Sequence, residues 1–193
     1  MLRPLFLLAA LAVASDGPSF ADALSRQGLR YAGARSYRGA RERSWGAAGS
    51  RRLAAASADA RLKASSEPDA DAAAARRRLG EWAARFLGQF AGDAAYPGMV
   101  TREVAVPDSL RPRRVEADGR TVWLAPASAG MAFGVGAEDL VAYRAVVSQR
   151  WCPGSRRSVE LALFFSTASY READALAEEA SFTCLGAAPR PAP

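Results

Sequence analysis

The sequence of 193 residues contains no histidine, no asparagine and no isoleucine, and Lys63 is its only lysine. Without histidine, a Ser-His-Asp or Cys-His catalytic site is excluded, and so are the zinc sites that depend on imidazole. Two cysteines are too few for a four-cysteine metal site, and no glycine loop followed by a lysine is present to hold a phosphate. We therefore expect neither a metal ion nor a cofactor in this protein.

A glycosidase-type site is not excluded, because it needs only two acidic side chains at a suitable separation. Each acidic residue that we consider also has a structural explanation, as a turn residue, as a charge at a helix N-terminus or as the solvent face of a strand. The candidates are Glu103, Glu116, Asp118, Glu138, Asp139 and Glu160. A carboxylate-dependent hydrolase of a glycan is thus an alternative function, and we favour a protein that is not an enzyme.

Residues 1–19 have the features of a secretory signal peptide. Arg3 precedes an apolar run over residues 5–14, and this run is too short to span a bilayer, which needs roughly twenty residues. Small side chains allow cleavage before Ser15 or before Phe20. We therefore expect the chain to enter the secretory pathway.

Residues 20–66 contain the whole basic excess of the chain. The net charge of the protein is +6, whereas residues 24–66 alone have ten basic and two acidic side chains, a local net charge of +8. Ala, Arg, Ser and Gly dominate this segment, and large apolar side chains are few. Because such a composition buries too little apolar surface to offset the entropy cost of ordering the chain, we predict that residues 20–66 are disordered.

The first 66 residues resemble the bipartite presequence of plastid proteins in algae with complex plastids, in which a signal peptide precedes an Arg- and Ser-rich transit peptide. Phe20 stands where such presequences have an aromatic residue, although the proline that usually follows is missing. The resemblance implies a plastid protein from which residues 20–66 are removed. A bacterial signal peptide followed by a basic linker, in a periplasmic or secreted protein, fits the same residues.

A further interpretation makes residues 24–66 a binding segment for an anionic surface or a nucleic acid. Tyr31, Tyr37 and Trp45 stand between the arginines and offer stacking faces, while the arginines offer phosphate contacts. The aromatic residues are sparse, and a chain on the secretory route seldom meets nucleic acid. We keep this function as an alternative in which nucleic acid is the less favoured partner.

Residues 67–186 have the patterns of one small single domain of the α+β class, with a mostly antiparallel sheet packed by about three helices. An apolar stripe with helical spacing predicts a helix over residues 69–90, whose many arginines also suit peripheral contact with a membrane. The alternation of apolar and polar side chains predicts a strand over residues 100–106. The proline-rich residues 187–193 are expected to form a loose tail.

A β-hairpin is predicted around Asp118-Gly119, the favoured pair for a two-residue turn. It consists of strands over residues 114–117 and 120–124, with Val115 opposite Val122 and Arg114 opposite Trp123.

The last third of the domain gives a helix, a strand and a second helix. Leu140, Tyr143, Val147 and Trp151 have helical spacing and predict a helix over residues 137–151. A short apolar run predicts a strand over residues 159–165. The capping-box spacing of Ser169 and Glu172 predicts a final helix over residues 170–180.

Cys152 and Cys184 are the only cysteines, and we expect them to form a structural disulfide in an oxidising compartment. In the chain-entropy model this cross-link contributes roughly 3 to 4 kcal/mol. Together with the missing catalytic residues, these patterns predict a non-catalytic accessory or binding domain whose partner is another protein. Trp82, Phe86 and the hairpin residue Trp123 are the candidate partner-binding residues.

Overall fold

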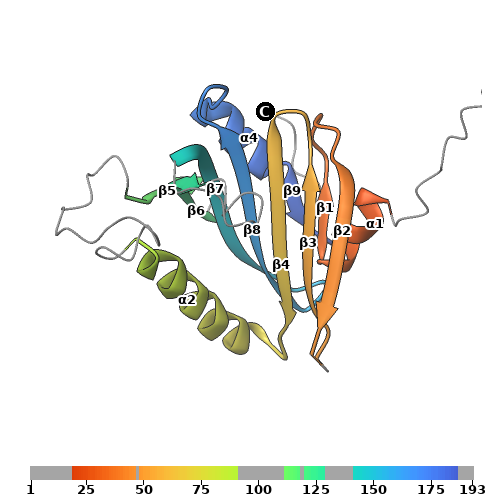
Figure 1. Ribbon diagram of the computed structural model, residues 1–193. Helices are drawn as coiled ribbons and strands as arrows, with labels where there is room; N and C mark the ends of the chain where they lie inside the picture. Colours follow the sequence, from red (N-terminus) through yellow and green to blue (C-terminus); the bar gives the residue numbers. More distant parts are fainter. Residues whose placement is uncertain (1–18, 47, 91–110, 118–119, 129–140, 187–193) are drawn as a thin grey trace, which may run out of the picture.

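A seven-stranded antiparallel sheet is the centre of the fold, with the strand order β2-β3-β4-β8-β7-β6-β5 (Figure 1). The computed structural model describes residues 19–46, 48–90, 111–117, 120–128 and 141–186. The strands of the sheet are β2 (Arg38–Trp45), β3 (Ser50–Ala56), β4 (Ala60–Pro68), β5 (Arg113–Ala117), β6 (Arg120–Ser128), β7 (Val141–Cys152) and β8 (Arg157–Ser166).

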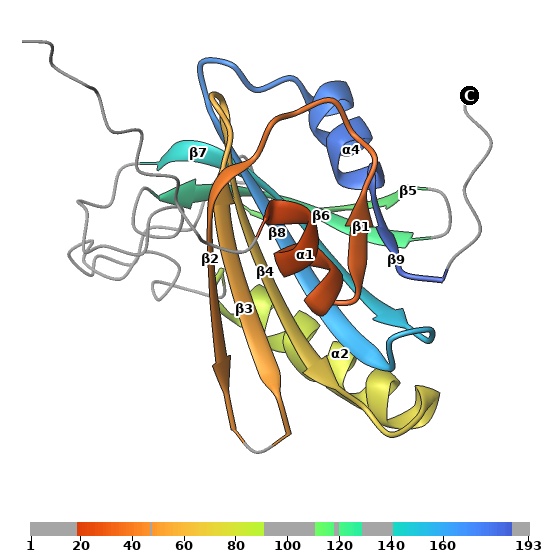
Figure 2. The ribbon, with the colours of Figure 1, turned by 90° about the vertical axis from the view of Figure 1, so that its right-hand side faces the viewer.

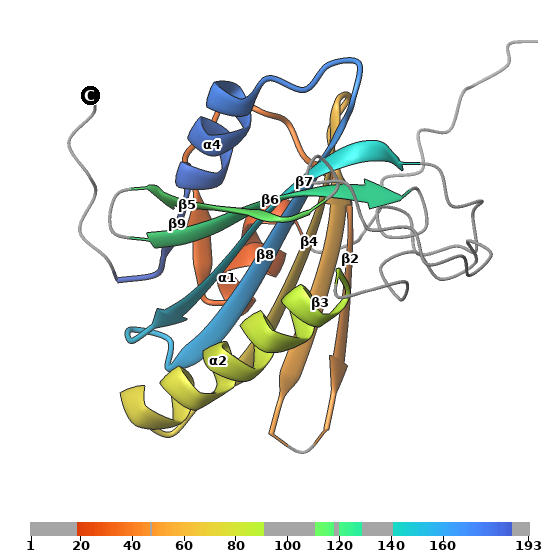
Figure 3. The same cartoon turned by 90° about the vertical axis from the view of Figure 1, so that its left-hand side faces the viewer.

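Helices cover both faces of this sheet. Helix α2 (Ala72–Gly88) lies across one face, and α1 (Phe20–Arg26) and α4 (Glu172–Ala180) lie on the other (Figure 2 and Figure 3). A two-stranded sheet consists of β1 (Leu29–Tyr31) and β9 (Phe182–Cys184), and these strands contact α1 and α4. No helix in the described part of the chain is both long and apolar enough to span a bilayer. The predicted class, a small α+β domain with a mostly antiparallel sheet, is confirmed.

Alternating side chains give the sheet two different faces. Along β4, Leu62 and Ala64 are buried on the side of α1 and α4, and Lys63 and Ser65 point to the side of α2. The main core lies on the first side and contains the largest fully buried apolar side chains, namely Leu24, Leu29, Leu53, Leu62, Leu161, Leu163 and Phe182. A smaller apolar cluster that includes Phe86 and Phe164 lies under α2.

The prediction that residues 20–66 are disordered is wrong, because this segment forms α1, β1, β2, β3 and most of β4. Only one face of β3 and β4 has to be apolar, and Leu53, Ala55, Leu62 and Ala64 provide it. A composition averaged over the segment hides this alternation. Without residues 20–66 the sheet would lack β2, β3 and most of β4, and β4 pairs with β8 inside the sheet.

Part of the basic charge of this segment is used in ion pairs. Glu42 binds Arg26 and Arg51, with nitrogen–oxygen distances of 2.7 and 3.2 Å. Arg35 binds the buried carboxylate of Glu178 on α4 at 2.9 Å. The contacts of Glu42 join β2 to α1 and β3, and the contact of Arg35 joins the loop before β2 to α4, so the arginines concerned have a structural role.

The predicted helix over residues 137–151 is also wrong, because the residues from Val141 onward form the long strand β7. Tyr143, Val147 and Trp151 are four residues apart, and this spacing places side chains on one face of a strand as well as on one face of a helix. Since β7 is buried on both faces over Ala145 to Ser148, its sequence lacks the alternation that would have identified it.

Several local predictions are confirmed. The helix expected over residues 69–90 is α2, and its N-cap Asp71 accepts hydrogen bonds from the backbone N–H groups of Ala73 and Ala74 at 2.9 and 2.8 Å. Strands β5 and β6 form the expected hairpin, with Val115 opposite Val122 and with Arg114 opposite Trp123. The strand expected over residues 159–165 is the middle of β8.

The final helix is confirmed as α4, but its predicted capping box is wrong. The N-cap residue is Arg171, which makes no capping hydrogen bond through its side chain, and Ser169 donates its hydroxyl to the carbonyl of Ser166 instead. The signal peptide up to residue 18, the strand over residues 100–106, the turn pair Asp118-Gly119 and the tail over residues 187–193 lie outside the described residues.

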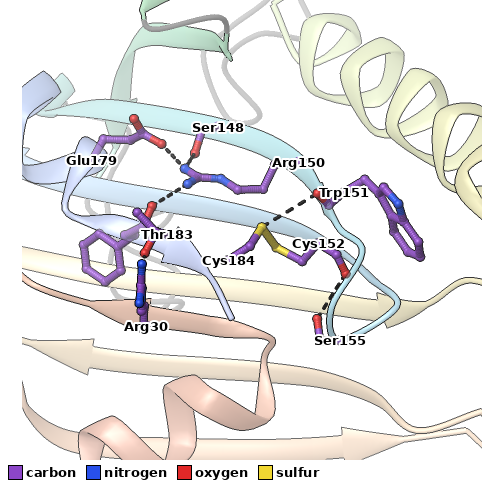
Figure 4. Close-up of a disulfide and its surroundings, with 10 residues drawn as sticks. Arg30, Ser148, Arg150, Trp151, Cys152, Ser155, Glu179, Thr183 and Cys184 are labelled. Atoms are coloured by element: carbon purple, nitrogen blue, oxygen red, sulfur yellow. Dashed lines mark hydrogen bonds and ion pairs between the residues drawn. A yellow bond between two sulfur atoms is a disulfide. The ribbon is translucent and has the colours of Figure 1, made fainter. Parts of the chain in front are cut away.

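The Cys152–Cys184 disulfide is confirmed (Figure 4). It joins the last residue of β7 to the last residue of β9, with 5.2 Å between the two Cα atoms. Beside it, the guanidinium of Arg150 contacts the buried carboxylate of Glu179 on α4, as Figure 4 shows. The disulfide and this ion pair fasten α4 and β9 to the central sheet.

Candidate functional site

A cleft of about 530 Å³ opens on the face of the sheet that α2 covers. Its floor consists of side chains from β2, β3, β4, β8 and β7, and the C-terminal part of α2 forms a wall through Arg85, Phe86 and Gln89. Small-molecule sites in proteins have volumes between about 300 and 1,000 Å³. This hollow, which we call the α2 cleft, therefore has the size of a ligand site.

The depth of the α2 cleft comes from small side chains in the middle of the sheet. The strand register aligns Arg41, Ala54, Lys63, Ala162 and Val147 in one row from β2 to β7. Ala54 and Ala162 stand between longer neighbours in this row, so each leaves a depression in the surface of the sheet. A cleft therefore forms without any break in the strand pairing.

A second row across the same strands is polar throughout. It aligns Arg43, Arg52, Ser65, Glu160 and Gln149 from β2 to β7. Gln149 donates a hydrogen bond from Nε2 to the carboxylate of Glu160 at 2.6 Å. The acidic group in this row is thus already bound on the β7 side, and the arginines stand at the opposite end, on β2 and β3.

Positive charge dominates the lining of the α2 cleft. The charged residues among its described lining are Arg41, Arg43, Arg52, Lys63, Arg85 and Glu160. Within the ranges that the structure describes, none of the four arginines forms an ion pair with an acidic residue. Their side chains are exposed, and this excess of positive charge makes the cleft attractive to an anion.

Lys63, the only lysine of the chain, lies partly buried in the floor of this cleft. Its ammonium group is 5.7 Å from the centroid of the Phe164 ring. Burial lowers the pKa of Lys63 below its usual value, and the nearby charge of Arg52 lowers it further. Arg52 itself is held by stacking on Trp45, at 4.8 Å from the ring centroid. An anion bound between these two cations would reduce their mutual repulsion.

Apolar side chains form the other end of the cleft. Phe86 and Phe164 both line it, and they are only 7% and 4% exposed. The Phe86 ring lies 6.1 Å from that of Trp123 and 5.3 Å from that of Phe90. Of the three candidate partner-binding residues, Phe86 lines the cleft, and Trp123 lies against Phe86 but is not among the described lining residues. The third, Trp82, is 4% exposed and belongs to the packing of α2.

The candidate carboxylates are not brought together where the structure describes them. Glu160 lies on β8, and Glu116 lies on the edge strand β5, where it is bound by Arg114 and Thr121. Two strands separate β5 from β8, a distance of about 14 Å at the usual strand spacing, whereas glycosidase carboxylates lie about 5 to 10 Å apart. Glu103, Asp118, Glu138 and Asp139 lie outside the described residues.

The sequence analysis treats the arginines of residues 24–66 only as a group, because it predicts this segment to be disordered, and so it does not show which cations share the cleft. The signal was present in their spacing: Arg41 and Arg43 are two residues apart, as are Lys63 and Ser65, which is the period of one strand face. Recognition of that period required β2, β3 and β4 to be identified first.

No group of histidine, cysteine or acidic side chains suited to a metal ion occurs among the described residues. A scan against protein-family models, a search of curated proteins and a search of solved structures each found no match to this chain.

Proposed function

We propose that this protein is a non-catalytic binding domain that takes a small anionic ligand in the α2 cleft. The observation that supports this function best is the charge of the cleft, which has five cationic side chains and one acidic side chain among its described lining residues. Four of these cations, Arg41, Arg43, Arg52 and Lys63, come from the basic segment over residues 24–66. Four of the ten basic side chains of that segment therefore line one site.

The cations are well placed to hold an anion. Three of the arginines belong to paired strands of one sheet, and strands hold functional side chains more rigidly than loops do. A guanidinium offers several donors in a planar arrangement that matches a carboxylate or a phosphate. The partly apolar floor around Lys63 and Phe164 excludes some water, which strengthens the attraction between opposite charges.

We further propose that the chain is delivered through the secretory route and that its mature form retains residues 20–66. The disulfide is of the kind found in oxidising compartments, and β2, β3 and β4 are needed to complete the sheet. Ser19 accepts a hydrogen bond from the N–H of Asp22 and caps α1. Cleavage before Ser15 keeps this cap, which favours that site over cleavage before Phe20.

The anion preference is tested with two fluorescent probes that share the same rings. The probe 8-anilinonaphthalene-1-sulfonate is anionic, and N-phenyl-1-naphthylamine lacks the sulfonate. We expect saturable binding of one sulfonate probe per chain and binding of the neutral probe that is weaker by about tenfold or more, since a hydrogen bond to a charged group contributes about 1.5 to 3 kcal/mol. Equal affinity of the two probes would contradict the proposal.

Matched variants assign this binding to the cleft. Arg52→Gln should weaken binding of the sulfonate probe by about tenfold, because it removes one charged donor. Arg76→Gln provides the control, because Arg76 is exposed on α2 and does not line the cleft. If the two variants weaken binding equally, the probe is responding to net charge alone.

Binding of the sulfonate probe is also expected to weaken as the pH rises from neutral into the alkaline range. The pKa of Lys63 is lowered by burial and by Arg52, so Lys63 loses its attractive charge at a lower pH than an exposed lysine does. Lys63 loses its proton at a lower pH in the native state than in the unfolded chain. Between these two pKa values the unfolded chain binds more protons, so the contribution of Lys63 to the free energy of unfolding increases with pH there. Lys63→Arg, which stays charged, should remove the alkaline weakening. Dissociation constants for both proteins across the pH series provide the measurement.

A further inference from the structure

We propose that the ligand of the α2 cleft is a single-chain amphiphile, with an anionic head group held at the β2 and β3 end and an apolar tail lying across the sheet toward β7 and Phe86. This inference rests on the proposed function and adds the chemical class and the orientation of the ligand.

Along the row of the sheet that contains Lys63, the lining of the cleft changes from charged to apolar, whereas the neighbouring row stays polar as far as Glu160 on β8. Arg41 and Arg43 stand at the β2 end, and Lys63 lies in the middle of the floor. Beyond Lys63, the same row continues with Ala162 and Val147. A ligand charged over its whole length would leave its distal charges on an apolar surface, and burial of an unpaired charge is unfavourable. A ligand with one charged end matches both halves.

The apolar half continues onto α2. Phe86 forms a wall of the cleft and Phe164 forms its floor, so apolar side chains from the helix and from the sheet face the same space. Ala145 and Ala162 lie beside them and keep that space open. An apolar tail placed there would contact aromatic and aliphatic side chains on more than one side.

The dimensions fit one extended chain. From β2 to β7 there are four strand-to-strand steps, which span about 19 Å at the usual spacing. The volume of about 530 Å³ is in the lower half of the range for ligand sites. A single tail suits this narrow trough better than a branched or two-tailed lipid does.

The same geometry favours a soluble amphiphile over a membrane surface. Phe86 and Phe164 are 7% and 4% exposed, so the apolar half of the cleft is recessed between α2 and the sheet. A helix that lies on a membrane must present its apolar face outward, and α2 instead buries Trp82 and Phe86. The ligand therefore has to enter the cleft as a single molecule.

Displacement of the sulfonate probe by carboxylates of increasing length tests the inference. Butanoate, octanoate and dodecanoate share one head group, and each is kept below its micelle concentration. We expect the affinity to rise with tail length by up to about fourfold per methylene, the factor that corresponds to burial of one CH₂ group. Dodecyl phosphate should bind as dodecanoate does, and dodecanol and dodecyltrimethylammonium should bind at least about tenfold more weakly.

A cavity-filling variant tests where the tail lies. Ala162→Leu extends a larger side chain into the apolar half and should lower the affinity for dodecanoate far more than the affinity for butanoate, so that the advantage of dodecanoate is lost. Ala177→Leu is the control, because Ala177 is exposed on α4 on the far side of the sheet. Thermal unfolding of both variants verifies that they are folded.

The outcomes separate the two proposals. Equal affinities for butanoate and dodecanoate would overturn the proposal of an amphiphilic ligand and leave the proposed anion site intact. A dodecanoate advantage that survives Ala162→Leu would also overturn it, because the tail would then lie elsewhere. Vesicle binding in place of binding to monomeric dodecanoate would overturn the assignment to a single soluble ligand. If the sulfonate probe itself does not bind, the proposed function fails as well.

Discussion

A chain that begins at Glu67 is expected to have no cooperative unfolding transition. Its sheet would lack β2, β3 and most of β4, and β8 would become an edge strand over most of its length. The buried faces of Leu161 and Leu163, which now pack in the main core, would be exposed to water. Strand β9 would lose its partner β1 as well. Such a loss of apolar burial exceeds the marginal stability of an ordinary domain.

Polar contacts reinforce this expectation. Buried Ser66 on β4 donates a hydrogen bond to the side-chain carbonyl of Gln27 at 2.8 Å and accepts one from Arg157 of β8 at 3.0 Å. Residues that follow α1 are thus tied to the middle of the sheet. Near-ultraviolet circular dichroism during a urea titration provides the measurement, with a chain that begins at Ser15 as the control. A cooperative transition of the shorter chain at a similar urea concentration would refute the integral role of residues 20–66.

The second large effect is expected for Arg150→Met. Arg150 contacts the fully buried carboxylate of Glu179, and it also donates hydrogen bonds to the carbonyl of Phe182 and, at 2.6 Å, to the hydroxyl of Ser148. Removal of one partner leaves a buried charge poorly compensated, which typically costs about 3 to 5 kcal/mol. Arg120 lies 3.2 Å from the same carboxylate and compensates it partly, so a loss near 3 kcal/mol is expected.

A double variant distinguishes the buried charge from lost packing. In Arg150→Met with Glu179→Leu, the Arg150–Glu179 pair is replaced by apolar side chains, so part of the lost free energy of unfolding should return. The recovery is limited because Arg120 loses its contact with Glu179. Urea unfolding of the single and double variants gives the values. A single variant within about 0.5 kcal/mol of the parent, the range of ordinary surface substitutions, would contradict a structural role for this ion pair.

Features that depend on neighbouring residues could be predicted from the sequence. The pairing of β5 with β6 follows from the Asp118-Gly119 pair in the sequence, and α2 follows from a single apolar stripe with an aspartate before it. The disulfide follows from the number of cysteines in the chain. In each case the deciding information lies within a short segment or in a simple count.

Features that depend on distant pairing could not be predicted in this way. Strand β4 is stabilised by β8, which lies nearly a hundred residues further along the chain, so the composition of residues 20–66 alone underestimates their order. In β7, Tyr143, Val147 and Trp151 are four residues apart, which fits both the helical period of about 3.6 residues and the strand period of two. Only the burial of this segment on both of its faces, inside the sheet, distinguishes the strand from a helix.

The candidate site illustrates the same limit. Its cations come from β2, β3, β4 and α2, and its apolar end comes from α2, β7 and β8. Only the strand order places Lys63 beside Phe164, and these two residues are about a hundred positions apart in the sequence. A charge count identifies the basic segment, but the register is needed to show which of its side chains share one face.

The most direct test of the anion site uses Lys63 itself. Because the chain has one lysine, reductive methylation with isotopically labelled formaldehyde labels only Lys63 and the N-terminal amine. Titration with the sulfonate probe should shift the NMR signal of methylated Lys63 and leave the N-terminal signal in place, with the same dissociation constant as the fluorescence measurement. Saturation of the fluorescence without movement of the Lys63 signal would show that the anion binds elsewhere and would contradict the assignment of this cleft.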